Sequence, residues 1–357
     1  MYTQLVKTNL LRVFALLFFV GAVFTLPVRA QTPTVTGFNI ITSPLPINLI
    51  TSPGTTVSTD LRIKNSGTQT EIYKVGLMKF DAYGEEGKPR LMDRGQGDDY
   101  FDWVSFSPSQ VEVAPNEWKT VTMTIKVPET AAFGYYYAVT FSRADDNSAA
   151  GPRQTTITGA TASLVLLEVR VPQAVRQVEV LDFSTDHRIF EFLPVSFRIR
   201  IANKGNVHVA PRGNIFVSQG SNKNVALLEV NPEVGNILPN SNRIFTTKWS
   251  DGFPVYTQKV EDGKTVLDSS GNQVYSLNWD FSQVSKLRWG KYTADLLLVY
   301  DDGVRDQTVA GQLTFWVMPW RLLAVGLVIV VLAFAGIRSI IKDTWKKFSP
   351  VKPTNPS

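Results

Sequence analysis

The chain has 357 residues and no cysteine, and its 36 lysines and arginines against 31 acidic residues give a formal charge of +5. Residues 1–30 carry +3 and residues 321–357 carry +5, which leaves −3 for the segment between them. This distribution argues against nucleic acid as a partner, and the absence of cysteine, with only two histidines, argues against a zinc or copper site.

The first 30 residues have the organisation of a secretory signal peptide. Two basic residues precede an apolar stretch at 13–26, and the sequence PVRA then offers small residues for cleavage after Ala30. The alternative is an uncleaved N-terminal anchor. Either interpretation places the chain from residue 31 to about Thr314 outside the cytoplasm. Because disulfides are absent, each domain there must be held together by burial alone, which fits a bacterial surface better than an animal extracellular protein.

The segment after the leader alternates between apolar and polar residues over short runs. Examples are TVSTDLRIK at 56–64, WKTVTMTIKV at 118–127 and YYYAVTFS at 135–142, with Gly, Pro, Asn and Asp between them. Such runs are typical of strands with one buried face, and no helical period interrupts them. The sequence predicts an all-β ectodomain of two tandem immunoglobulin-like β-sandwiches.

Three landmarks recur in the same order in the two halves of this ectodomain. They are Asn65-Ser-Gly67 and Asn203-Lys-Gly205, Ala114-Pro-Asn116 and Leu238-Pro-Asn240, and Phe133-Gly134 and Trp289-Gly290. We expect the Asn-x-Gly pairs to form turns in which both residues tolerate positive φ. The repeat predicts two copies of one topology, with domains at 31–172 and 173–314 divided near Pro172.

The second half contains additional residues at about 251–278. Strand-like runs at 255–260 and 274–278 flank two turn signals, so we expect a protruding hairpin arm. Such an arm is either a binding device or a neutral decoration.

Catalytic residues are not evident in the sequence. Acidic pairs at Asp98-Asp99, Asp145-Asp146 and Asp301-Asp302 either solvate turns or bind calcium, and they match no defined calcium loop. Neither histidine has the context of a nucleophile–base pair, and no glycine-rich loop cradles a phosphate. We therefore predict a protein that is not an enzyme and has no cofactor.

Aromatic side chains are the better candidates for ligand binding. Alternation along the strand sends Tyr135 and Tyr137 to one face and Tyr136 to the other. Together with Trp103, Tyr135 and Tyr137 form a predicted ligand-binding set, because aromatic rings suit sugars and protein partners. The alternative is that these rings pack in the core.

The C-terminal segment 315–337 is apolar over about 23 residues, enough to cross roughly 30 Å of hydrocarbon. Trp316 and Trp320 are predicted to anchor it at the outer headgroups, where Arg321 can snorkel. Arg338 begins a basic tail at 338–357, which predicts a single-pass protein with its N-terminus outside and its C-terminus in the cytoplasm. The alternative is a buried core helix, which would carry a polar stripe.

The order of these landmarks resembles that of the bacterial WxL-interacting proteins. The motifs that carry the resemblance are Ser43-Pro44-Leu45-Pro46, Pro53-Gly54, Ser107-Pro108, Val113-Ala-Pro115, Val127-Pro128 and Gly134. The resemblance implies a peptidoglycan-binding first domain and a second domain that contacts a host ligand or surface partner. The arm at about 251–278 departs from the family pattern.

From these observations we expect a membrane-anchored bacterial cell-surface binding or scaffold protein. Its expected partners are peptidoglycan or another wall polymer, a surface or host protein, and the bilayer. The alternative function is an extracytoplasmic export or surface-assembly factor that captures strands of a partner protein.

Overall fold

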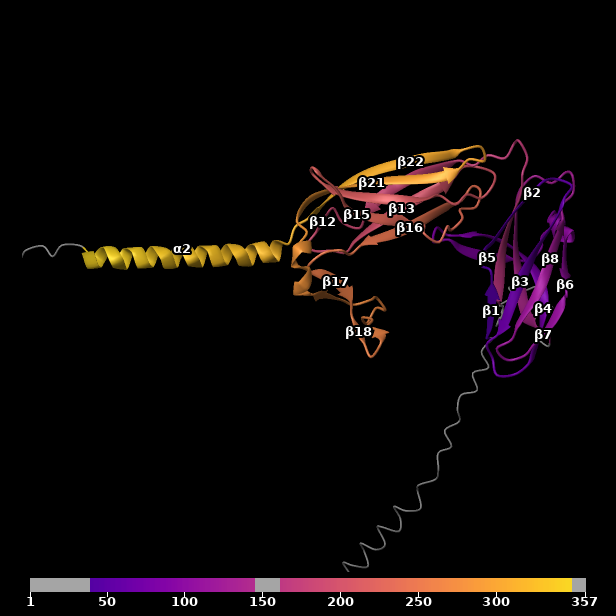
Figure 1. The fold of residues 1–357 in the computed structure, drawn as a ribbon, viewed down its shortest axis with the longest axis horizontal. Coiled ribbons are helices and arrows are strands. Elements are labelled where there is room, and N and C mark those ends of the chain that lie inside the picture. The colour runs from indigo at the N-terminus through magenta and orange to yellow at the C-terminus, as the bar shows by residue number, and fades with distance from the viewer. Residues whose placement is uncertain (1–38, 145–160, 349–357) are drawn as a thin grey trace, which may run out of the picture. The chain divides into compact units, whose positions relative to one another are not determined.

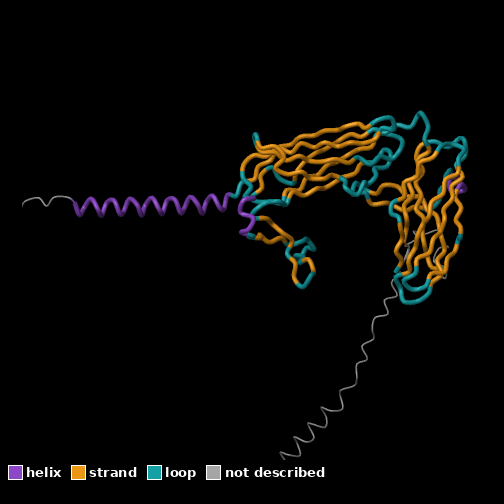
Figure 2. The backbone as a smooth tube through the Cα atoms, viewed as in Figure 1, coloured by secondary structure: helices purple, strands orange, loops and turns teal. Residues whose placement is uncertain are grey.

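The computed structural model describes residues 39–144 and 161–348. Within these ranges the chain forms two tandem immunoglobulin-like β-sandwiches and a C-terminal apolar helix, which confirms the predicted fold class (Figure 1). Figure 2 shows that strands make up most of both sandwiches. The predicted signal peptide, the acidic pair Asp145-Asp146 and the chain beyond Phe348 lie outside the described residues.

The first sandwich contains a four-stranded and a six-stranded sheet. The four-stranded sheet has, in spatial order, β1 (Ile40–Ser43), β3 (Thr56–Asn65), β8 (Trp118–Lys126) and β6 (Val104–Ser107). The six-stranded sheet has β2 (Ile47–Thr51), β10 (Thr161–Val169), β9 (Phe133–Arg143), β4 (Glu71–Tyr83) and β5 (Lys88–Met92), and β7 (Gln110–Val113) also pairs with β4. A 3-10 turn, η1 (Asp99–Trp103), leads into β6.

Alternation along β3 and β8 produces the core between these sheets. Leu61 and Ile63 on β3 are fully buried, and the intervening Arg62 is exposed. Val121 and Met123 on β8 are buried in the same way. The period of two in the sequence thus separates a core face from a solvent face on each strand.

The second sandwich contains a three-stranded and a five-stranded sheet. The first has β11 (Val178–Thr185), β13 (Val195–Asn203) and β16 (Asn242–Trp249), and the second has β12 (Ile189–Phe190), β22 (Asp306–Val317), β21 (Gly290–Asp301), β14 (Arg212–Gln219) and β15 (Asn222–Val230). Trp249, Tyr292 and Phe315 are buried between them, with ring centroids 5.2 Å apart for Trp249–Tyr292 and 5.7 Å for Tyr292–Phe315. This aromatic core joins the sheets without a disulfide.

The segment that follows β16 forms the hairpin arm. Its longer strands are β17 (Val255–Gln258) and β20 (Tyr275–Asn278), and its tip carries β18 (Val260–Glu261) and β19 (Lys264–Thr265). Val255 packs against the core of the second sandwich, whereas both tip strands are exposed. A second 3-10 turn, η3 (Phe281–Lys286), connects the arm to β21.

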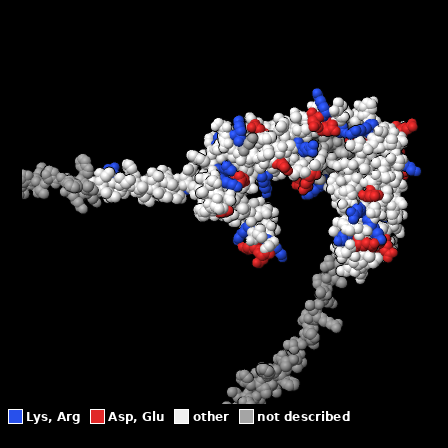
Figure 3. Space-filling model, in the orientation of Figure 1, with Lys and Arg blue, Asp and Glu red and all other residues white. Residues whose placement is uncertain are grey.

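The apolar helix α2 (Trp320–Phe348) begins five residues later than the predicted segment 315–337 and ends later. Phe315 and Trp316 belong to β22 instead, because Phe315 fills the core of the second sandwich and Pro319 separates strand from helix. Residues Trp320–Lys342, with a mean hydropathy of 2.5, are long and apolar enough to cross a membrane, and none of their most apolar window is buried. Figure 3 shows that the surface of α2 is free of charged side chains along most of its described length.

The two Asn-x-Gly landmarks have equivalent hydrogen bonds at the ends of β3 and β13. Asn203 donates from Nδ2 to the carbonyl oxygens of Val207 at 2.8 Å and Ile237 at 2.9 Å, and its Oδ1 accepts from the amide of Gly205 at 2.9 Å. Asn65 donates to the carbonyl oxygens of Gln69 at 2.7 Å and Val113 at 3.0 Å, and accepts from the amide of Gly67 at 2.8 Å. The two halves therefore share a local topology.

The expectation that the two Asn-x-Gly turns use positive φ is wrong, because neither the asparagine nor the glycine of either turn has a positive φ. Positive φ occurs instead at the second pair of landmarks, where Asn116 has φ 62° and Asn240 has φ 54° just before β8 and β16. At the first pair, the buried asparagine side chain braces the loop by hydrogen bonding. Gly205 is required there because a Cβ would lie 2.1 Å from the carbonyl oxygen of Val175.

Candidate binding cleft

The six-stranded sheet of the first sandwich is apolar on both faces. Tyr137 and Val139 on β9 face the interior, so Ala138 between them faces outward, and it is also fully buried. Ala138 forms the centre of an outer apolar cluster together with Phe80 and Leu166. This cluster packs against Leu238 of the second sandwich. The surrounding members are Met78, Ala82, Leu91, Tyr136, Ala162 and Leu164.

Among the described residues, Leu238 covers only part of this outer face, and the rest lines a cleft. The cleft has a volume of about 710 Å³. Phe80, Leu91 and Leu164 line it on the first sandwich, and Ile237 and Arg243 line it on the second. A site of this size and lining suits an apolar ligand with a few polar groups.

Arg243 and Glu233 are the charged residues of the second sandwich that line the cleft. Its Nη1 donates to the carbonyl oxygen of Asn236 at 2.9 Å, and its guanidinium carbon lies 5.0 Å from the ring centroid of Phe245. Burial lowers the pKa of Arg243, and the nearby charge of Glu233 opposes that change. No ion pair joins Arg243 to a carboxylate in residues 39–144 and 161–348, so the cleft offers a half-buried cation to an anionic group.

Hydrogen bonds and an ion pair to Glu85 fix one side of the cleft. Glu85 lies in the turn between β4 and β5 and accepts hydrogen bonds from Arg200 Nε at 2.9 Å and 3.0 Å and from Asn242 Nδ2 at 3.1 Å. Its backbone carbonyl accepts from the amide of Ile244 at 2.6 Å. The Arg200 hydrogen bonds, followed by that of Asn242, lower the pKa of Glu85, so the carboxylate stays charged at neutral pH.

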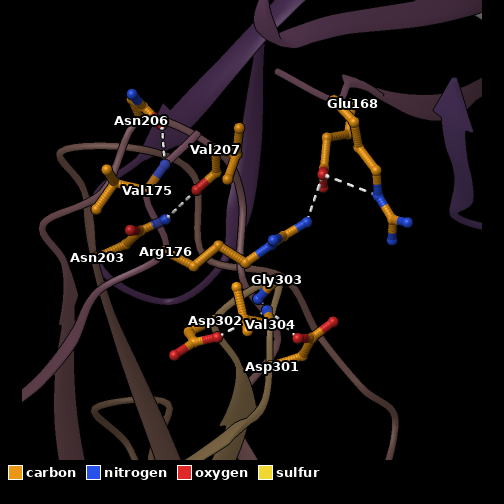
Figure 4. A network of polar contacts seen from close by, with 11 residues as sticks. Glu168, Val175, Arg176, Asn203, Asn206, Val207, Asp301, Asp302, Gly303 and Val304 are labelled. Carbon is orange, nitrogen blue, oxygen red and sulfur yellow. Dashed lines mark hydrogen bonds and ion pairs between the residues drawn. The ribbon is translucent and has the colours of Figure 1, made fainter. Parts of the chain in front are cut away.

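A second group of polar contacts, around Glu168, lies where the chain passes from β10 to β11 (Figure 4). The buried carboxylate of Glu168 pairs with Arg176, and the more exposed Arg170 lies 3.7 Å away. The Arg176 guanidinium also lies against Gly303, where a Cβ would meet its Nη1. Asn206 holds this segment by accepting from the amide of Val175 at 2.7 Å.

The buried ring of His208 completes the contact between the sandwiches. Its centroid lies 5.8 Å from that of Tyr136, and its Nδ1 has no hydrogen-bond partner within the described ranges. Burial is the main cause that lowers the pKa of His208 to about 4. The charge of Glu168 raises the pKa by a smaller amount, and that of Arg176 lowers it further. The ring is therefore neutral at neutral pH.

The predicted ligand-binding tyrosines occupy different environments. Tyr137 is fully buried, and burial raises its pKa, so its predicted role as a surface ligand contact is wrong. Its hydroxyl donates to the carbonyl oxygen of Tyr100 at 3.2 Å. Tyr135 and Trp103 are half-buried, 4.7 Å apart between ring centroids, and Tyr100 lies 5.3 Å from Tyr135. These three residues form an aromatic cluster that is partly open to solvent.

The predicted membrane anchors also separate in the structure. Trp320, Arg321 and Arg338 are on α2, and Arg321 Nε pairs with Glu191 at 3.4 Å. Trp316 is on β22, close to the start of the helix, and its side chain is exposed.

The acidic pairs stabilise turns. Asp302 accepts from the amides of Val304 and Arg305 and from Gln307, and these hydrogen bonds, that of Gln307 first, lower its pKa to about 2. Asp98 accepts from the amide of Gly95 and pairs with Lys79 at 3.2 Å. Among the residues that the structure describes, no group of three or more His, Cys, Asp or Glu is placed to hold a metal ion.

Sequence reasoning did not identify the cleft or Arg243. One available signal was the nearly continuous apolar run SLVLLEV at 163–169, which is typical of a strand buried on both faces. The partner of that second face, the loop around Leu238, could not be inferred from periodicity.

Comparisons with known proteins identify no family for this sequence. No family model matches it, and no curated protein matches it. Among solved structures, the class 5 fimbriae chaperone CfaA is 14% identical, with a TM-score of 0.35, over 77% of this chain and 98% of that one. The chaperone–tip adhesion subunit complex CsuC–CsuE of Acinetobacter baumannii is 10% identical, with a TM-score of 0.33, over 76% and 97%. The YadV chaperone is 9% identical, with a TM-score of 0.32, over 78% and 100%. At these values the likeness carries no functional argument.

Proposed function

We propose that this chain is a membrane-anchored binding protein that captures an apolar, carboxylate-bearing segment of another protein in the cleft between its sandwiches. The observation that carries the proposal is the incompletely covered outer face of the six-stranded sheet, beside a half-buried Arg243 that has no carboxylate partner within the described ranges. This function is close to the predicted surface-assembly factor. The helix α2 supports attachment to a membrane.

The cleft favours capture through side chains over strand addition. β5 is the edge strand beside the cleft, and it begins Lys88-Pro89-Arg90. Proline and charged residues are features that block pairing at a sheet edge. The apolar face behind the edge remains available, and its burial supplies affinity in proportion to the apolar area covered.

A carboxylate on the ligand would complete the site. A hydrogen bond to a charged group contributes about 1.5–3 kcal/mol, which corresponds to roughly ten- to a hundredfold in affinity. Arg243 therefore discriminates between ligands with and without an anionic group, whereas the apolar wall discriminates little.

The test uses the full chain in detergent and two pools of eight-residue peptides rich in Val, Leu and Phe, one with free and one with amidated C-termini. Fluorescence polarisation should show tighter binding of the free-acid pool, and Arg243→Gln should abolish that difference. Arg212→Gln, at an exposed position of the same sandwich, is the matched control. Equal binding of both pools, or an Arg243→Gln protein that still distinguishes them, contradicts the proposal.

The aromatic cluster of Tyr100, Trp103 and Tyr135 favours a second candidate function, contact with peptidoglycan. Partly open rings can stack on sugars, and this function is the one that the WxL-interacting resemblance implies. Trp103→Leu should reduce cosedimentation of the full chain with purified peptidoglycan, whereas Trp118→Leu on β8 should not. Wild-type cosedimentation by Trp103→Leu would remove this candidate.

A further inference from the structure

Exposed apolar side chains gather where the second sandwich joins α2. The most exposed are Phe281 at 72%, Trp289 at 61% and Val284 at 57%. The whole group, here called the apolar collar, comprises Trp279, Phe281, Val284, Leu287, Trp289, Trp316, Met318 and Trp320. Half of the chain's eight tryptophans are among these residues, so the collar is unlike the rest of the surface.

Strand pairing places both parts of the collar at one end of the second sandwich. Gly290, which follows Trp289, pairs with Val317, which precedes Met318. The turn η3 is attached at the same end, because the amide of Phe253 donates to the carbonyl oxygen of Lys286 at 3.0 Å. Figure 2 shows this short helical turn near the start of α2.

The collar is the outer side of a packed aromatic group. Phe253 is buried, with its ring centroid 5.8 Å from that of Trp279 and 5.6 Å from that of Phe281. Phe192, also buried, lies 6.4 Å from Trp279. These inner rings hold η3 against the sandwich, so the exposed rings have a fixed support.

Nearby charges are bound within the sandwich. Lys286 and Arg288 both pair with Asp251, at 2.6 Å and 3.0 Å, and Arg321 pairs with Glu191 at 3.4 Å. Each of these basic side chains is thus held by a carboxylate, and Lys286 and Arg288 share one. An apolar, aromatic surface whose basic side chains are held in this way is suited to a partner that is itself apolar.

We propose that the apolar collar inserts into the interfacial layer of the same bilayer that α2 spans. This inference rests on the proposed membrane attachment. The collar is continuous with the span, since only Met318 and Pro319 separate β22 from α2, and two residues reach no more than about 7 Å. Tryptophan is enriched where membranes meet water, and this composition favours lipid over a protein partner. The second sandwich is thus held to the membrane by α2 and by its own end face.

The absence of native cysteine allows site-specific labels on the full chain. Phe281→Cys, Leu332→Cys at the middle of α2, and Val304→Cys in the exposed turn at the opposite end of β21 and β22 would each carry an environment-sensitive fluorophore. The chain would be reconstituted in phosphatidylcholine–phosphatidylglycerol nanodiscs, with or without lipids that carry a nitroxide near the headgroup or deep in the chain.

We expect the label at residue 281 to be quenched at least twofold by the shallow nitroxide, the label at 332 by the deep one, and the label at 304 by neither. Quenching at 332 without quenching at 281 would overturn the collar proposal and leave the membrane attachment intact. An unquenched label at 332 would overturn the attachment itself. A blue-shifted but unquenched label at 281 would show a protein contact and would also overturn the proposal.

Discussion

The buried asparagines Asn65 and Asn203 provide a sharp stability test, because they occupy equivalent positions in the two sandwiches. Replacement of Asn203 by alanine leaves three partners without their bonds, namely the carbonyl oxygens of Val207 and Ile237 and the amide of Gly205. Each buried polar group that loses its partner costs about 1–3 kcal/mol. Both donated bonds come from the same side-chain amide, and the surrounding loop can relax after the substitution. We therefore expect the free energy of unfolding to fall by about 3–4 kcal/mol in total.

The same change at Asn65 should cost less. Its bonds to Gln69 and Gly67 are only partly buried, so water can replace them after the substitution. The bond to the carbonyl oxygen of Val113 is buried. We expect Asn65→Ala to lower the free energy of unfolding by about 2 kcal/mol.

Urea unfolding of the full chain in detergent, followed by tryptophan fluorescence and far-UV circular dichroism, measures both losses. The exposed substitutions Ser66→Ala and Lys204→Ala in the same turns are the controls, each expected to lie within about 0.5 kcal/mol of the wild type. If the sandwiches unfold separately, each asparagine variant should shift only its own transition. A loss below about 1 kcal/mol for Asn203→Ala would refute the argument that these bonds brace the loop.

Three further predictions concern the contact between the sandwiches. Burial lowers the pKa of His208 to about 4, below the value of about 6.5 for an unfolded chain. Because the unfolded chain takes up the proton first, the free energy of unfolding should fall by up to about 3 kcal/mol as the pH is lowered from about 6.5 to about 4. His208→Leu should flatten this decrease in pH-dependent melts. Arg176→Met should destabilise by about 3 kcal/mol, because it leaves the buried Glu168 carboxylate with only the more exposed Arg170, 3.7 Å away. The added Glu168→Gln should recover part of that loss in urea titrations. Gly205→Ala should lower the melting temperature by several degrees, since its Cβ would overlap the carbonyl oxygen of Val175.

Local alternation predicted the strands well but could not tell which face would be covered. The positions of Leu61 and Ile63 follow directly from the period of two. The same period separates Tyr136 from Tyr135 and Tyr137, yet Tyr136 and Tyr137 are both packed against other residues, on opposite faces of β9. Tyr137 enters the core, and Tyr136 contacts Phe80 and His208. For Tyr137 the structure therefore shows the alternative, packing in the core, and not a contact open to ligand.

The start of the membrane segment illustrates a related difficulty. The apolar residues Phe315 and Val317 continue without a polar break towards the helix, so composition alone assigns them to the span. Their burial in the second sandwich depends on pairing with β21, which no local pattern reveals. Pro319 was the better boundary signal, because proline is favoured at the first turn of a helix and interrupts a strand.

The position of the cleft depends on contacts between segments far apart in the chain. Glu85 and Glu168 fix the two sandwiches by directional polar bonds, whereas Leu238 fills only part of the apolar face between them. A ligand that contacts both Leu91 and Ile237 should therefore stabilise both sandwiches, by about 2.7 kcal/mol at a hundred times its dissociation constant. A ligand that lies on the sheet face alone should stabilise only the first. The shift of the two unfolding transitions on adding the free-acid peptide pool distinguishes these cases, and stabilisation of the first sandwich alone would remove Arg243 from the site.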